Sequence, residues 1–185
     1  MEFNLNTRLN ELRDQVAAID REIVAALAVR SRSGARAPAS SSDASDLITP
    51  AIRAEYAQLV ARKICTRPAA ASETAACEAA DAVLLEAVRN RLRVAREIAR
   101  AKAAGQHPRF CALVEARDAV ALESAITQRD VEEQVIARAV TAARELPPQD
   151  LSITFADTVA GVFRDWLIPL ARRIQVEVLL GKAEG

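Results

Sequence analysis

Residues 9–30 read LNELRDQVAAIDREIVAALAVR. Apolar side chains recur in this stretch every three or four residues, the spacing that places them along one face of an amphipathic helix. The spacing begins slightly before residue 9 and ends just after residue 30, so the sequence predicts a helix over residues 5–31. The apolar positions are Leu5, Leu9, Leu12, Val16, Ile19, Ile23 and Leu27.

The composition of the whole chain favours helices as well. Of 185 residues, 51% are hydrophobic, 40 are Ala, and only 3% are aromatic, which is typical of helix formers rather than strand formers. This predicts an all-α protein with a single domain over residues 1–185. The 25 basic and 25 acidic residues cancel, which argues against a nucleic-acid partner.

Further helices are expected over residues 49–65, 72–104 and 110–145, the last in one or two pieces, and after Asp150. The pattern predicts a bundle of about five helices, with a flexible insertion at about residues 32–47, where Ser, Ala, Gly and Pro replace the apolar spacing. Pro169 lies inside the last helix and should kink or bulge it. No apolar stretch is long enough to cross a membrane, so we expect no membrane contact and a cytoplasmic location.

A short internal repeat is visible. EIVAALAVRSR at residues 22–32 aligns with VLLEAVRNRLR at residues 83–93, an offset that places Arg30 on Arg91. A duplication would produce this match, and so would chance in a chain rich in helix formers.

Several kinds of catalytic site have no signature here. The sequence lacks a Gly-rich phosphate loop, a zinc-protease motif and a nucleophile elbow. The cysteines Cys65, Cys77 and Cys111 form no C-x-x-C pair, which favours structural thiols. We therefore expect neither a metal nor a cofactor.

Cationic side chains on otherwise apolar helix faces are the distinctive feature. They are Arg13, Arg30, Arg91 and Lys102. Because Arg91 and Lys102 are eleven residues apart, about three turns, their side chains project from the same side of a helix. Such cations suit a pocket for a small dianion, since Arg binds carboxylates through a bidentate fork. The alternative is that their stems cover the core while their charges remain in water.

The first helix resembles that of the all-helical chorismate mutases, because residues 9–30 match the family pattern at Leu12-Arg13, Val16, Ile19-Asp20, Ile23-Val24, Leu27 and Arg30. The second half of that family helix, an Arg followed eleven residues later by a Lys, resembles residues 84–104 instead. ITQRDVEEQVIARA at residues 126–139 is similar to the second family helix. The last family helix is matched by Phe163, Ile168, Ala171, Arg172, Ile174 and Gln175.

The resemblance implies a pericyclic rearrangement of chorismate to prephenate without covalent catalysis. It gives Lys102 and Gln175 the role of donors to the substrate's ether oxygen, and Glu132 that of binding its hydroxyl. It also implies that arginine side chains bind the two substrate carboxylates. The candidates for carboxylate and other substrate contacts are Arg13, Arg30, Arg91, Arg129 and Arg172.

Two positions depart from the family pattern, with Gln128 in place of an Asp and Val131 in place of an Arg. An altered pocket leaves two alternatives open. The protein is then an enzyme similar to isochorismate pyruvate lyase, or a non-catalytic regulatory or scaffold protein that retains the fold.

Simple members of the family are dimers that share a site between chains, and we expect a homodimer here.

Overall fold

The structure, a computed structural model, describes residues 2–36, 47–65, 67–105, 108–147 and 154–181. These residues form seven continuous helical stretches and no β-strand, apart from one isolated bridge between Ala35 and Pro68. The predicted all-α class is confirmed. No helix in these ranges is long and apolar enough to span a membrane.

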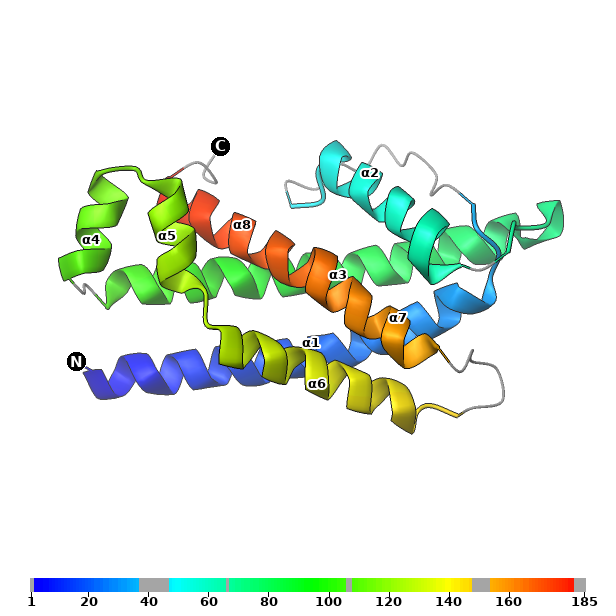
Figure 1. Ribbon diagram of the computed structural model, residues 1–185, viewed down its shortest axis with the longest axis horizontal. Coiled ribbons are helices and arrows are strands. Elements are labelled where there is room, and N and C mark those ends of the chain that lie inside the picture. The colour runs from blue at the N-terminus through cyan, green and yellow to red at the C-terminus, as the bar shows by residue number, and fades with distance from the viewer. Residues whose placement is uncertain (1, 37–46, 66, 106–107, 148–153, 182–185) are drawn as a thin grey trace.

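Two long antiparallel helices form the centre of the molecule (Figure 1). They are α1 (Glu2–Arg32) and α3 (Thr74–Ala104), each of 31 residues, or about 46 Å at 1.5 Å per residue. Their facing sides bury Ile23, Leu27 and Leu84 in the main core. The helices expected over residues 5–31 and 72–104 are therefore present with close to the predicted bounds.

The helix expected over residues 49–65 is α2 (Pro50–Leu59), continued by a π-helical turn, Val60–Ile64. The Thr49 hydroxyl accepts the N–H of Ile52 at 3.3 Å, and Pro50 occupies the first turn, where its missing N–H costs nothing. Of the predicted insertion, residues 37–46 lie outside the described residues. Residues 33–36 leave the helix.

The expectation of one or two helices over residues 110–145 was wrong, because this region is divided into three. They are α4 (Pro108–Glu115), α5 (Ala119–Ile126) and α6 (Arg129–Glu145). Arg117 has a φ of 53°, the left-handed conformation that ends a helix, and the Asp118 carboxylate then accepts the N–H of Ala121 at 3.0 Å. The α4–α5 hairpin lies at one end of the bundle, and α6 runs beside α1 (Figure 1).

The last helix is continuous but bulged. It comprises α7 (Phe155–Val162), a π-helical turn (Phe163–Leu167) and α8 (Ile168–Leu179). The π turn ends two residues before Pro169, which lacks an N–H and whose ring would clash with the carbonyl four residues earlier in a regular helix. The predicted distortion at Pro169 is confirmed, and α8 packs against α3.

Candidate active site

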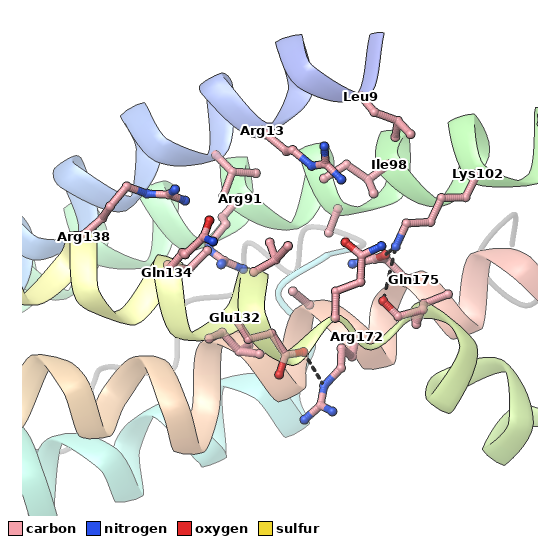
Figure 2. Close-up of a pocket in the computed structure, with 18 residues that line it drawn as sticks. Leu9, Arg13, Arg91, Ile98, Lys102, Glu132, Gln134, Arg138, Arg172 and Gln175 are labelled. Carbon is pink, nitrogen blue, oxygen red and sulfur yellow. Dashed lines mark hydrogen bonds and ion pairs between the residues drawn. The ribbon is translucent and has the colours of Figure 1, made fainter. Parts of the chain in front are cut away.

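A pocket of about 290 Å³ lies between α1, α3, α6 and α8 (Figure 2). Its volume is at the lower end of the range for ligand pockets, which suits a small molecule. Apolar side chains of all four helices form much of its wall. The polar residues that line it are Arg13, Arg91, Lys102, Gln128, Glu132, Gln134, Arg138, Arg172 and Gln175.

Helix α3 contributes Arg91 and Lys102 to the same pocket, as their eleven-residue spacing predicts. Arg91 is 5% exposed, and its Nε donates to Oδ1 of Asp20 on α1 at 2.7 Å. Burial raises the pKa of Asp20, while the positive charges of Arg91 and Arg138 act in the opposite direction. The terminal amino groups of Arg91 have no hydrogen-bond partner among the described residues.

Lys102 is half-buried, and its ammonium group donates to Oε1 of Gln175 on α8 at 3.3 Å and to the Ile126 carbonyl at 3.5 Å. Within the described ranges no carboxylate lies within 4 Å of the Lys102 Nζ. Burial lowers the pKa of Lys102, and the charge of Arg13 lowers it further. The ammonium is therefore a cation without a counter-charge among the described residues, the state expected where an anionic ligand binds.

Arg13 projects from α1 toward the same space as Lys102 (Figure 2). It is exposed, and its Nη1 donates to Oδ1 of Asn10 one turn earlier at 3.1 Å. Asn10 is its one hydrogen-bond partner among the described residues, and because this partner is neutral, most of the guanidinium remains available. Arg13 thus provides a second positive charge at the more open side of the pocket.

Glu132 and Arg172 form a loose pair across the opposite wall. The Arg172 Nε lies 3.6 Å from Oε1 of Glu132 and is buried without a hydrogen bond to any described residue. The Arg172 Nη1 donates to the Thr127 hydroxyl at 3.3 Å. Arg172 is consequently held by α5–α6 side chains, and it holds the Glu132 carboxylate at the pocket.

Six of the eight predicted site residues line this pocket: Arg13, Arg91, Lys102, Glu132, Arg172 and Gln175. Arg30 and Arg129 do not. Arg129 is the first residue of α6 and is exposed, so it does not replace the family Arg that Val131 lacks.

The expectation for Arg30 is corrected by its surroundings. Arg30 is fully buried away from the pocket, with its Nε 2.5 Å from Oδ1 of Asp81 and its Nη1 donating to the Gly34 carbonyl at 3.0 Å. Its Nη1 also lies 3.1 Å from the sulfur of Cys65. The side chain is saturated by protein partners, because a cation inside a core requires them. Arg91 rather than Arg30 is the central arginine of the pocket.

Sequence reasoning missed Arg138, which lines the pocket from α6. It follows Val131 by seven residues, about two helical turns, and so lies on the same face of α6. Helical spacing counted from Val131 would have identified it. No group of three or more potential metal ligands converges among the described residues.

The sequence model of the type II chorismate mutase family matches residues 75–176 of this chain, slightly more than half of its length. The chain belongs to the type II chorismate mutase family. The matched segment begins with α3, which carries Arg91 and Lys102, and ends in α8.

Two fungal chorismate mutases are similar in sequence. The chain is 25% identical over 117 residues to that of Pichia angusta, covering 58% of this chain and 41% of that protein. It is 26% identical over 111 residues to that of Emericella nidulans, covering 57% of this chain and 42% of that protein. The matches thus span about two-fifths of these curated relatives.

The fold is that of a solved family member. The chorismate mutase of Candida albicans, in complex with L-Trp, superposes with a TM-score of 0.80 at 16% sequence identity. The match covers 97% of this chain and 94% of that one. The helical arrangement of a chorismate mutase is therefore retained over nearly the whole chain.

Proposed function

We propose that this protein is a chorismate mutase, an isomerase that converts chorismate to prephenate in the α1–α3–α6–α8 pocket. The observation that carries the proposal is the convergence of Arg13, Arg91 and Lys102 on one small pocket of a chain from this family. Cations collected beside apolar walls suit a compact, doubly charged substrate better than they suit a solvated surface.

The two substrate carboxylates are assigned to the arginines. Arg91 is fixed at its Nε by Asp20, so its terminal amino groups are free to bind one carboxylate. Arg13, on the open side, binds the other. Carboxylates held at two fixed points keep the flexible side chain of the substrate folded over its ring, which reduces the entropy lost on reaching the transition state.

Lys102 and Gln175 are assigned to the ether oxygen. During the rearrangement the C–O bond breaks while a C–C bond forms within the substrate, and no proton or group passes to the protein. Negative charge builds on the departing oxygen. Because the Gln175 carbonyl already accepts from Lys102, its amide N–H and the ammonium are left to donate to that oxygen, where they stabilise charge present mainly in the transition state.

Glu132 is assigned to the substrate hydroxyl, as an acceptor held in place by Arg172. Gln128 and Val131 line the same part of the pocket, where the resemblance led us to expect an Asp and an Arg. Arg138, two turns along α6, supplies a positive charge to this wall instead.

We also propose that the protein is a homodimer in which each pocket is formed by one chain, because all of the described lining residues belong to a single chain. Activity per chain should therefore stay constant on dilution below the dimer dissociation constant, while mass measurement in solution reports the dimer.

The cytoplasmic location and the single domain stay predictions, testable by cell fractionation and by limited proteolysis.

The test is incubation of the purified protein with chorismate, following the loss of its ultraviolet absorbance and identifying the product. Saturable formation of prephenate is the expected result. Release of pyruvate, from chorismate or from isochorismate, would replace the mutase with a lyase. Absence of turnover of either compound at high protein concentration would indicate a non-catalytic member of the family.

A further inference from the structure

Two buried ion pairs join the central helices in a reciprocal manner. Asp20 on α1 pairs with Arg91 on α3 at 2.7 Å, and Arg30 on α1 pairs with Asp81 on α3 at 2.5 Å. The two acids are separated by the same number of residues as the two arginines, which is also the offset of the internal repeat. Because α1 and α3 are antiparallel (Figure 1), the Asp of each helix lies opposite the Arg of the other. The two ion pairs are therefore related by an approximate exchange of α1 with α3.

The surroundings of the two pairs differ. The Arg30 guanidinium also donates to the carbonyls of Gly34 and Arg36, and the Asp81 Oδ1 also accepts the Tyr56 hydroxyl. The Arg30–Asp81 pair, which we call the closed pair, is therefore hydrogen-bonded on all sides and stabilises the core. Its residues do not line the pocket.

At the other end the pair is left incomplete. Asp20 is 5% exposed, and its Oδ2 is buried with no hydrogen-bond partner in the part of the chain that the structure describes. Arg91 is bonded only through its Nε among the described residues. Arg138 lines the same pocket from α6, and its charge acts on Asp20. Asp20 is thus faced by two arginines, and both of them reach the pocket.

One hydrogen bond to Nε restricts the plane of an arginine side chain while leaving its two terminal amino groups unoccupied. A long side chain held in this way loses little further freedom when it binds a carboxylate with both amino groups. In the closed pair the two terminal amino groups of Arg30 already donate to backbone carbonyls. The Arg30–Asp81 pair therefore stabilises the core, whereas the equivalent Asp20–Arg91 pair leaves a cationic group available at the pocket.

We propose that Asp20 is a positioning residue, which orients Arg91 so that its terminal amino groups receive a substrate carboxylate. This inference rests on the proposed function, since it names the group that the oriented Arg91 binds. Asp20 itself does not touch the substrate. Asp81, its counterpart, has no such role.

The test compares Asp20→Asn with Asp81→Asn. Each substitution keeps the size of the side chain and one oxygen for the arginine Nε, and each removes one buried charge from an equivalent pair. We expect both variants to melt at a lower temperature than the wild type. Only Asp20→Asn should lose kcat/KM, by about 10- to 100-fold, the loss typical of residues that orient a metal ligand through a hydrogen bond, and mainly through a higher KM.

A purely structural role for Asp20 predicts a different result, in which the two variants lose stability together and keep kcat/KM within about twofold of the wild type. That result would overturn the proposal, and so would an equal loss of kcat/KM in Asp81→Asn. If Asp20→Asn does not fold, Asp20→Glu keeps the charge but displaces the carboxylate by one methylene, and the same rise in KM is expected. Failure of both variants to fold, while Asp81→Asn folds, would make Asp20 a structural residue.

Calorimetric binding of chorismate separates this proposal from the proposed function. If the wild type binds chorismate without turning it over, the proposed mutase function is wrong. Weaker binding by Asp20→Asn than by Asp81→Asn would still support the proposal that Asp20 positions Arg91. Equal binding by the two variants contradicts positioning whether or not turnover occurs.

Discussion

Replacing Lys102 by Met should slow the reaction greatly without destabilising the protein. Met has a similar length and an apolar body, so it fills the same space between Gln175 and the Ile126 carbonyl. What is lost is the ammonium group, which lies 3.3 Å from Oε1 of Gln175 and has no carboxylate partner in the described part of the chain. Its charge is therefore available to the substrate.

The expected loss follows from the charge that develops on the ether oxygen. Two unit charges 4 Å apart interact by about 4 kcal/mol at an effective dielectric constant of about 20, so half a charge gives about 2 kcal/mol. A hydrogen bond from a charged donor adds about 1.5–3 kcal/mol, part of which the ground state already makes. A net loss of about 3 kcal/mol corresponds to a fall in kcat of about 100-fold, with a smaller change in KM.

The stability of the same variant should change in the opposite sense. Burial lowers the pKa of Lys102, which means that its charged form is less stable in the folded protein than in water. A folded-state pKa below the unfolded one makes the charged lysine unfavourable to folding at neutral pH. The melting temperature of Lys102→Met should consequently equal or exceed that of the wild type.

Lys63→Met is the matched control. Lys63 is exposed and pairs with Asp165 on the last helix, so this variant makes the same change of charge away from the pocket. Steady-state kinetics by chorismate absorbance and thermal unfolding by circular dichroism are measured for both variants. A kcat for Lys102→Met within about threefold of the wild type would contradict a catalytic role for the Lys102 ammonium, as would an equal loss of kcat in Lys63→Met.

Three further results are expected. Arg91→Lys keeps a charge for Asp20 but loses the bidentate fork, so kcat/KM should fall about 10- to 100-fold, whereas Arg93→Lys on the exposed side of α3 should leave it unchanged; steady-state kinetics that treat both alike would contradict the site. In a pH series, kcat/KM should fall as pH rises through the lowered pKa of Lys102, because the ammonium is the active form, and Lys102→Arg, which stays charged, should lose this alkaline limb; a limb that persists in the variant belongs to another group. Gly34→Ala should cost about 1–3 kcal/mol in urea unfolding, since its Cβ would lie 2.2 Å from the Ala69 Cα, and unchanged stability would show that this approach is not as close as described.

Much of the fold follows from the sequence because α1 and α3 carry unbroken helical spacing. The same spacing placed Arg91 and Lys102 on one side of α3, since eleven residues is nearly a whole number of turns. The breaks within residues 110–145 were harder to see. They depend on a left-handed residue at Arg117 and a cap at Asp118, and a single Asp in a polar stretch is a weak signal.

The site was less predictable where it depends on contacts between distant segments. Arg30 continues the apolar stripe of α1 as Arg91 continues that of α3, and local spacing does not distinguish them. The difference arises because Arg30 contacts Asp81, Gly34 and Cys65 in the core, whereas Asp20 is the only hydrogen-bond partner of the Arg91 side chain among the described residues. The repeat did contain part of this information, because extending it ten residues upstream of Arg30 and Arg91 aligns Asp20 with Asp81.

The proposed mechanism requires a pocket that is complementary to the transition state rather than to a dicarboxylate in general. The most direct test measures the affinity of a stable oxabicyclic dicarboxylate that copies the chair-shaped transition state, alongside that of chorismate, in the wild type and in Lys102→Met. We expect the wild type to bind the mimic at least about 100-fold more tightly than chorismate, and this preference to be smaller in Lys102→Met. Equal affinity of the wild type for the two compounds would contradict it.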